Sequence, residues 1–204
     1  IAGTLVVTTP GVPSELRAML PTVCARVTDK LGGGELYRLR LQTFGMGEST
    51  AQALIDNDTT PWPGDVVLGF RAGMPQLEIK LTASADTPDV QRCRQTLERL
   101  FGDHILGEND TTLAGAVQTG LRDQDKKLVT AESCTGGLIA SMMTAEAGAS
   151  SVFEAGFVTY ANTIKQSVLG VSEATLETEG AVSEAVVMQM LRGALQRSHA
   201  DIGI

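Results

Sequence analysis

The pattern of apolar and polar positions in residues 35–109 predicts a small α+β unit. Residues 37–44 alternate between apolar and polar side chains, as a half-buried strand does, and residues 88–101 repeat apolar side chains at helical spacing. The remaining predicted elements are a short helix, two strands that form a hairpin around Gly73, and a last edge strand: 48–55, 66–70, 77–81 and 104–106. The order βαββαβ is that of a ferredoxin-like, split βαβ unit.

Residues 110–204 have a different organisation, in which strands alternate with helices. The predicted strands are 127–131, 153–160 and 202–204. The predicted helices are 113–121, 137–144, 164–169, 173–179 and 183–196. Such alternation indicates a layered α/β domain.

Residues 1–34 form a third segment at the start of the chain. Residues 4–8 are predicted as a strand and residues 10–13 as a turn, after which a helix begins with Ser14 as its N-cap. The three glycines at positions 32–34 predict a tight junction. The expected fold class is therefore α/β, with domains at 1–34, 35–109 and 110–204.

The composition is that of a globular protein with an acidic balance. Hydrophobic residues make up 43% of the 204 residues, charged residues make up 20%, and the net charge is −8. An acidic chain repels phosphate backbones, and residues 35–107 also lack a basic run and the GxxG spacing of a nucleic-acid-binding KH loop. No apolar run reaches the length of about 18 residues that spans a bilayer, and no signal peptide starts the chain. We therefore expect neither a nucleic-acid nor a membrane partner.

Cysteine and histidine usage restricts the chemistry further. The three cysteines, Cys24, Cys93 and Cys134, are scattered, which indicates a reducing, cytoplasmic compartment and no disulfide framework. No CxxC or CxxH spacing supports a zinc site, and we expect no metal ligands in this chain. His104 and His199 are the only histidines and stand far apart, so a two-histidine metal site and a Ser-His-Asp triad are both disfavoured.

The stretch at residues 131–137, with the sequence AESCTGG, is the most informative for chemistry. It lies where a predicted strand turns into a helix, and free N–H groups at a helix start attract anions and can stabilise an oxyanion. Ser133 in this turn is a candidate nucleophile, while the alternative is that Ser133 or Thr135 only caps the helix. The adjacent Cys134 is a candidate thiol nucleophile, although adjacent residues of a turn point in different directions.

Lys165 is the candidate base for that serine. A nucleophilic serine needs an activating base, and a lysine serves as one only where burial or a nearby charge lowers its pKa. The alternative is that Lys165 is an exposed helix lysine. Ser150 and Ser151 precede the strand at 153–160 and suit a phosphate or a sugar hydroxyl, or they form a plain polar loop. Ser183 is interpreted as a structural helix cap.

Several motifs together resemble one known family. Residues 131–137, 148–153 and 156–165, followed by 169–171 and 180–183, resemble the amidase domain of the competence/damage-inducible protein A (CinA) family. Residues 37–49 resemble the middle domain of that family. Residues 10–15 resemble the end of its first, molybdopterin-binding-like domain.

The resemblance implies an activity and a set of roles. It implies hydrolysis of the carboxamide of nicotinamide mononucleotide to nicotinate mononucleotide and ammonia, in pyridine-nucleotide salvage. It also implies that Ser133 is the nucleophile, that Lys165 is the base, and that the amidase needs no cofactor and works as a cytoplasmic homodimer. The implied oxyanion donors are the backbone N–H groups of Thr135, Gly136 and Gly137. The implied pocket residues are Ser150 or Ser151, Tyr160 and Asn162.

Two alternatives to the amidase hypothesis stay open. The chain begins at Ile1 without a methionine and stops at Ile204 in an apolar stretch, so we expect a fragment that lacks most of the first domain and part of the amidase domain. In the family, that first domain resembles an ADP-ribose pyrophosphatase that uses a divalent metal, and this activity is the first alternative. A non-enzymatic competence or repair scaffold is the second. The joint presence of Ser133 and Lys165 favours the amidase.

Overall fold

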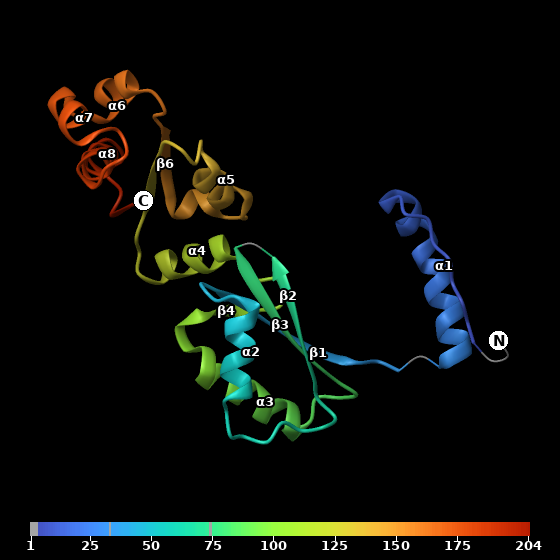
Figure 1. The fold of residues 1–204 in the computed structure, drawn as a ribbon. Helices are drawn as coiled ribbons and strands as arrows, with labels where there is room; N and C mark the ends of the chain where they lie inside the picture. The colour runs from blue at the N-terminus through green and yellow to red at the C-terminus, as the bar shows by residue number, and fades with distance from the viewer. Residues whose placement is uncertain (1–3, 33, 74) are drawn as a thin grey trace.

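The computed structural model describes residues 4–32, 34–73 and 75–204 and shows a mixed α/β fold with two separate sheets (Figure 1). The first sheet is formed within residues 37–108 and the second within residues 128–203. This arrangement confirms the expected fold class. The domain limits that the sequence suggested stay predictions.

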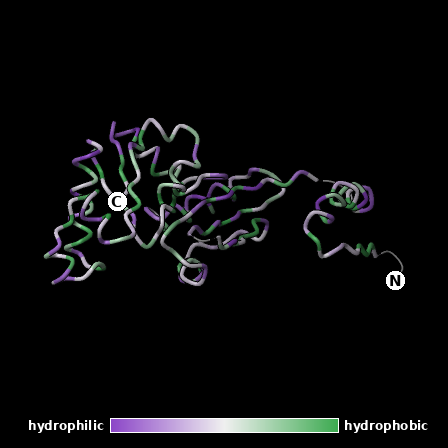
Figure 2. Tube along the Cα trace, turned by 90° about the horizontal axis from the view of Figure 1, so that it is seen from above, coloured by the Kyte–Doolittle hydropathy of each residue, from purple (hydrophilic) through white to green (hydrophobic). Residues whose placement is uncertain are grey.

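The N-terminal segment stands apart from both sheets as one long helix (Figures 1 and 2). Helix α1 (Pro13–Leu31) begins at a proline, whose fixed φ suits the first helical position. Its N-cap, Val12, makes no side-chain cap bond. The prediction of Ser14 as the N-cap is wrong, because Ser14 already lies inside the helix.

The predicted strand at residues 4–8 does not form in the described part of the chain. These residues run beside α1 instead, where Leu5 to Thr8 and Met19 line a common hollow. A strand needs a neighbour to pair with its backbone groups, and no described strand lies beside this segment. Of the predicted glycine junction, residue 33 lies outside the described residues.

The first sheet has the predicted βαββαβ order. Its elements are β1 (Tyr37–Phe44), α2 (Glu48–Asp56), β2 (Val67–Gly73), β3 (Gln76–Ala83), α3 (Pro88–Phe101), the 3-10 turn Gly102–His104 and β4 (Ile105–Glu108). Neighbouring strands are antiparallel in the order β2-β3-β1-β4, which is the arrangement of a ferredoxin-like sheet. The prediction for this unit is confirmed, except that His104 belongs to the turn before the last strand.

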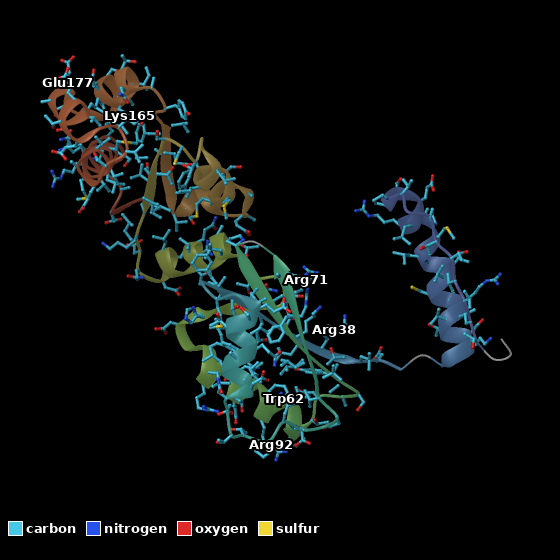
Figure 3. The ribbon with its side chains drawn as sticks, in the orientation of Figure 1. Arg38, Trp62, Arg71, Arg92, Lys165 and Glu177 are labelled. Atoms are coloured by element: carbon cyan, nitrogen blue, oxygen red, sulfur yellow. The ribbon has the colours of Figure 1, made fainter. Side chains whose placement is uncertain are left out.

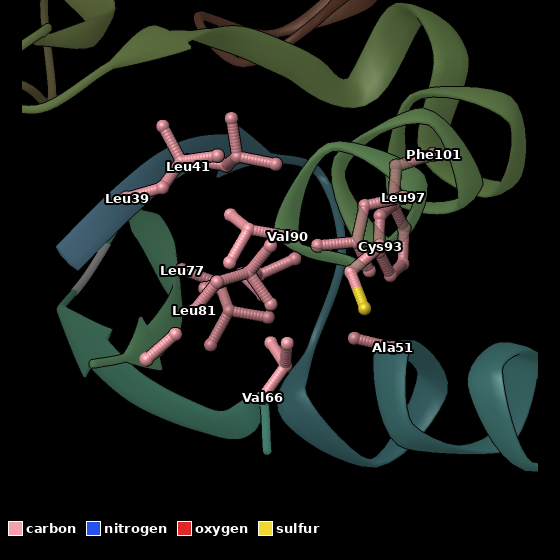
Figure 4. Packing of buried hydrophobic residues seen from close by; sticks show 12 residues of the cluster. Leu39, Leu41, Ala51, Val66, Leu77, Leu81, Val90, Cys93, Leu97 and Phe101 are labelled. Atoms are coloured by element: carbon pink, nitrogen blue, oxygen red, sulfur yellow. The ribbon is translucent and has the colours of Figure 1, made fainter. Parts of the chain in front are cut away.

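Helices α2 and α3 cover one face of the first sheet and bury its apolar side chains (Figure 4). Leu41 of β1 pairs in register with Ile79 of β3, and both side chains are fully buried. Leu97 and Phe101 of α3 pack into the same core. Burial of one such side chain stabilises the fold by about 1.5–3 kcal/mol, so this core holds the unit together.

Two glutamine side chains join the first sheet to the start of the C-terminal half. Gln42 Nε2 donates to the backbone oxygen of Asn109 at 2.7 Å, and the backbone N–H of Leu113 donates to Gln76 Oε1 at 3.1 Å. These bonds connect β1 and β3 with helix α4 (Leu113–Asp123). They hold the start of α4, which leads into the second sheet, against the first sheet.

The second sheet is parallel and has the strand order β6-β5-β7. After α4, the elements are β5 (Leu128–Glu132), α5 (Leu138–Ala145), the 3-10 turn Ala149–Ser151, β6 (Phe153–Val158), α6 (Asn162–Leu169), α7 (Glu173–Glu179), α8 (Glu184–Ser198) and β7 (Ile202–Gly203). Apart from the 3-10 turn, each agrees with a predicted element to within a few residues. The predicted alternation of strands and helices is thus confirmed.

Helices cover both faces of this sheet. Leu128 and Phe153 face α4 and α5, whereas Val129 and Phe157 belong to the core formed with α6, α7 and α8. Helix α8 approaches the end of α6 so closely at Gly193 that a Cβ there would overlap the carbonyl oxygen of Leu169. The result is a three-layer α/β/α arrangement that holds the ends of β5 and β6 firmly in place.

Candidate active site

The carboxyl ends of β5 and β6 lie at the same edge of the second sheet. The two strands are parallel, and Glu132 at the end of β5 is in register with Val158 at the end of β6. Ser133 follows β5 directly, and Lys165 lies near the start of α6, which follows β6. Ligands bind at this edge of open parallel sheets, because loops and helix starts converge there. The fold therefore brings Ser133 and Lys165 together.

The side chain of Lys165 is directed into the protein rather than into solvent. Only 2% of the residue is exposed, and Figure 3 places it among the C-terminal helices. Its Nζ donates to Ser133 Oγ at 3.1 Å and to the backbone oxygen of Tyr160 at 2.7 Å. None of the ion pairs in the described residues involves it. The alternative of an exposed helix lysine is wrong.

Glu132, which the sequence analysis did not single out, fixes the turn that carries Ser133. Only 2% of the residue is exposed, and its carboxylate accepts three backbone N–H bonds from the start of α5. Oε2 accepts from Gly137 at 3.0 Å and from Ile139 at 3.1 Å, and Oε1 accepts from Ala140 at 2.8 Å. A carboxylate suits this place, because the N-terminus of a helix attracts negative charge.

Two opposing effects set the pKa of the Glu132 carboxyl. Burial raises it, but hydrogen bonds from Ala140, the Thr135 side chain, Ile139 and Gly137 together lower it below its usual value. The carboxylate is therefore the stable form inside the fold at neutral pH. A signal for this role was present in the sequence as an acidic residue just before the glycine-rich helix start.

This carboxylate corrects the expectation that Ser133 or Thr135 caps α5. The N-cap residue is Gly137, which makes no side-chain cap bond, and the carboxylate of Glu132 satisfies the first N–H groups instead. Gly136 and Gly137 have φ values of 62° and 95°, a left-handed conformation that favours glycine. The hydroxyl of Ser133 is thus left to the contact with Lys165.

The implied set of oxyanion donors also changes. The N–H of Gly136 donates to the backbone oxygen of Ser133 at 3.1 Å, and the N–H of Gly137 donates to Glu132. Both groups are already used inside the turn. Within the described residues, the N–H groups of Cys134 and Thr135 have no acceptor, and both residues line the pocket beside Ser133. They are the donors that this turn leaves for a ligand.

A pocket of about 250 Å³ opens beside this turn. One side is the turn itself, from Ala131 to Thr135. The other side is mainly aliphatic and comes from α5, α8 and the loop before α8: Ile139, Ala181, Val182, Val187 and Met190. The pocket thus combines polar donors and a hydroxyl on one side with an apolar wall that suits a flat ring.

The other residues that the family resemblance implied do not gather around Ser133. Ser150 and Ser151 precede β6, so they lie at the opposite end of the parallel sheet. Ser151 lines a separate hollow of about 380 Å³ with Arg122 and two neighbouring lysines, Lys126 and Lys127. Their expected grouping with the nucleophile is not found, because residues before and after a strand lie at opposite edges.

Tyr160 and Asn162 do lie at the correct edge, but with exposed side chains. Tyr160 is 75% exposed, and its contribution is the backbone oxygen that accepts from Lys165. Asn162 is the first residue of α6 and is also exposed. Neither is among the residues that line the pocket.

Cys134 lines the same pocket as Ser133 and has an exposed thiol. No hydrogen bond of the described residues links it to Lys165, whose side chain contacts Ser133 instead. The geometry thus separates the two candidate nucleophiles that the sequence left open.

Metal and membrane sites are not found in the described part of the chain. No group of three or more histidine, cysteine, aspartate or glutamate side chains there is placed to hold a metal ion. No described helix is long and apolar enough to cross a membrane.

Comparisons with known proteins match this chain to one family. A family model described as "CinA C-terminal domain" matches residues 110–204. A CinA-like protein from Colwellia psychrerythraea is 42% identical over 206 residues, which cover 96% of this chain and 47% of that protein. A CinA-like protein from Shewanella loihica is 39% identical over 191 residues, which cover 91% of this chain and 44% of that protein.

Among solved structures, the competence/damage inducible protein CihA from Agrobacterium tumefaciens is 48% identical, with a TM-score of 0.44. The match covers 45% of this chain and 55% of that one. The chain spans about half the length of the curated relatives that it matches. It nevertheless aligns with them over nearly its whole length, and it belongs to the CinA family.

Proposed function

We propose that this chain hydrolyses the carboxamide of nicotinamide mononucleotide to nicotinate mononucleotide and ammonia, as a step of pyridine-nucleotide salvage. The observation that supports it most is the hydrogen bond of 3.1 Å between Lys165 Nζ and Ser133 Oγ at the edge of a parallel sheet. A hydroxyl beside a buried amine is the arrangement that a Ser-Lys hydrolase needs. Membership of the CinA family supports the choice of substrate.

The first half of the proposed reaction forms an ester on Ser133. Lys165, as the neutral amine, takes the hydroxyl proton while Ser133 Oγ forms a bond to the carboxamide carbon. The carbonyl electron pair moves onto oxygen, and the unpaired N–H groups of Cys134 and Thr135 stabilise that charge. When the carbonyl reforms, the C–N bond breaks and the proton on Lys165 passes to the leaving nitrogen, which departs as ammonia.

The second half releases the acid. A water molecule attacks the ester carbon while Lys165 takes one of its protons. The bond between carbon and Ser133 Oγ then breaks, and the proton returns from Lys165 to the serine oxygen. These steps use only side chains, backbone N–H groups and water.

The pocket beside Ser133 supports a substrate with a flat ring that carries a carboxamide. Its wall is aliphatic, and the polar groups of the turn face it from one side. Such a site holds the flat face of the nicotinamide ring by van der Waals contact and the carboxamide by hydrogen bonds. The ribose phosphate would extend outward, beyond the aliphatic residues.

Ammonia release from nicotinamide mononucleotide by the intact protein tests the proposal, beside a folded Ser133→Ala variant. We expect Ser133→Ala to lower kcat by at least about 10²-fold, because it removes the nucleophile. Undiminished release by this variant would refute the role of Ser133. Metal-dependent release of AMP from ADP-ribose that survives Ser133→Ala, without ammonia release by the unchanged protein, would favour the pyrophosphatase alternative.

A further inference from the structure

We infer that Glu132 is the positioning residue of this site, and this inference rests on the proposed role of Ser133 as nucleophile. Within the described residues, the Glu132 side chain makes no hydrogen bond or ion pair with Lys165. Its buried carboxylate instead holds the turn from Ser133 to Gly137 against the start of α5 through three backbone N–H bonds. The turn is thereby fixed before any substrate arrives.

The bonds of the carboxylate decide which donors remain for the substrate. Glu132 uses the N–H of Gly137, and the turn uses the N–H of Gly136 internally. The N–H groups of Cys134 and Thr135, which follow Ser133 in the turn, have no acceptor in the described structure. Loss of the carboxylate would release Gly137 and let the turn rearrange, so that these two donors would no longer be held beside Ser133.

The backbone of Glu132 also ties the nucleophile to the base. Its carbonyl oxygen accepts from the N–H of Thr159 at 2.8 Å, at the end of β6. The next residue, Tyr160, provides the backbone oxygen that holds Lys165 Nζ at 2.7 Å. One residue therefore fixes the turn of Ser133 with its side chain and the segment that anchors Lys165 with its backbone.

The position requires both the charge and the length of glutamate. A glutamine would place an NH₂ donor against backbone N–H groups, so at least one of the three bonds would be lost. An aspartate keeps the charge but is shorter by one methylene group, so it cannot reach Gly137, Ile139 and Ala140 together. A misplacement of about 1 Å far from the chemistry can cost about 10²-fold in rate.

The test compares Glu132→Gln with Ser172→Ala in the intact protein. Ser172 caps α7 by accepting from the N–H of Thr175, lies outside the pocket, and serves as a matched helix-cap control. The first readout is kcat and KM for ammonia release from nicotinamide mononucleotide. The second is the rate at which diisopropyl fluorophosphate labels Ser133, followed by peptide mass spectrometry. In that labelling the serine oxygen bonds to phosphorus, fluoride leaves, and the proton passes to Lys165.

We expect Glu132→Gln to lower both kcat and the labelling rate by about 10²-fold with KM little changed, while Ser172→Ala leaves all three near their original values. Equal slowing by both variants, or labelling and kcat unchanged in Glu132→Gln, would overturn the inference. If Glu132→Gln does not fold, Glu132→Asp takes its place. We then expect a smaller loss of kcat and of labelling rate, and the same two results would overturn the inference.

The two readouts separate this inference from the proposed function. If the unchanged protein releases no ammonia but its Ser133 is labelled in a Glu132-dependent way, the proposed substrate is wrong and the positioning role stands. If ammonia release depends on Ser133 and Glu132→Gln keeps full activity, the proposed function stands and the positioning role of Glu132 is wrong. The absence of both ammonia release and labelling in the unchanged protein counts against both proposals.

Discussion

Lys165 Nζ lies 3.1 Å from Ser133 Oγ, although the two residues are 32 positions apart in the chain. The contact follows from the parallel pairing of β5 with β6, because the carboxyl ends of parallel strands meet at one edge of the sheet. One residue comes directly after β5 and the other comes from the helix after β6. The contact between the two residues thus results from the sheet topology, and the proposed role of each residue can be tested separately.

Replacement of Lys165 by methionine tests the base. Methionine keeps the apolar stem without the amine, so we expect the variant to fold while kcat falls by about 10²–10⁴-fold, the usual contribution of a general base. Lys127→Met is a matched control, because Lys127 is exposed and pairs with Glu154. We expect this control to retain its activity. The measurement is kcat for ammonia release by both variants.

Either of two results would contradict the role of Lys165. One is a Lys165→Met variant that folds and keeps more than about a tenth of the original kcat, since a general base contributes about 10²-fold or more. The other is an equal loss in Lys127→Met, which would point to a general effect of charge. Thermal unfolding of both variants shows whether each one is folded during the assay.

Replacement of Cys134 by alanine tests which neighbour is the nucleophile. Lys165 contacts the hydroxyl of Ser133 and not the thiol of Cys134, so we expect Cys134→Ala to keep kcat within about threefold, less than a tenth of the loss that removal of a nucleophile causes. Cys134 lines the pocket, so we expect its replacement to change KM more than kcat. An acyl adduct trapped on Cys134, or activity lost in Cys134→Ala but kept in Ser133→Ala, would reverse the assignment.

The sequence predicted those elements well whose pattern is local. Strand β1 and helices α3 and α7 have the bounds that periodicity and capping residues suggested. The strand expected at residues 4–8 failed, because strand formation depends on a neighbour that the local pattern does not reveal. Ser14 failed as a cap for a different reason: the helix begins at Pro13, and its N-cap, Val12, lies two residues before Ser14.

The candidate site was predictable in part. A serine and a lysine beside strand ends could be singled out from the motifs, because ligands bind at the carboxyl ends of the strands in open α/β sheets. The position of Ser150 and Ser151 could not be predicted, since two motifs that are close in sequence can lie at opposite edges of the sheet. The role of Glu132 was also missed: the acidic residue before the glycine-rich helix start was visible in the sequence, but its three backbone bonds form only in the folded turn.

Two glycine replacements test the strain in the turn. Gly137 has a φ of 95°, and a Cβ there would lie 3.2 Å from Val158 Cγ2. We expect Gly137→Ala to destabilise the protein by about 1 kcal/mol or more and to lower kcat, because an L side chain is strained in this conformation. Gly120 lies inside α4 with open space around it, so Gly120→Ala should stabilise the protein by about 0.5–1 kcal/mol. Chemical denaturation measures the change in the free energy of unfolding that each substitution causes. Changes of the same sign in the two variants would contradict the expectation.

The depressed pKa of Glu132 predicts how stability changes in acid. The folded state holds this carboxyl below its ordinary pKa of about 4.3, so the unfolded chain takes up its proton first as the pH falls. Its contribution to the free energy of unfolding is therefore fully present above that value and is lost as the pH falls through the lower, folded value. Other carboxyls with lowered pKa values, such as those of Asp58 and Asp201, add their own acid dependence.

A comparison of Glu132→Gln with the unchanged protein isolates the contribution of this one group. We expect the gap between their free energies of unfolding to be constant from neutral pH down to about pH 5 and to narrow below it, since glutamine does not titrate. Urea denaturation at closely spaced pH values, under one ionic strength, measures the gap. A gap that stays constant down to the acid limit of folding would mean that the carboxyl is not held in its ionised form by Gly137, Ile139 and Ala140.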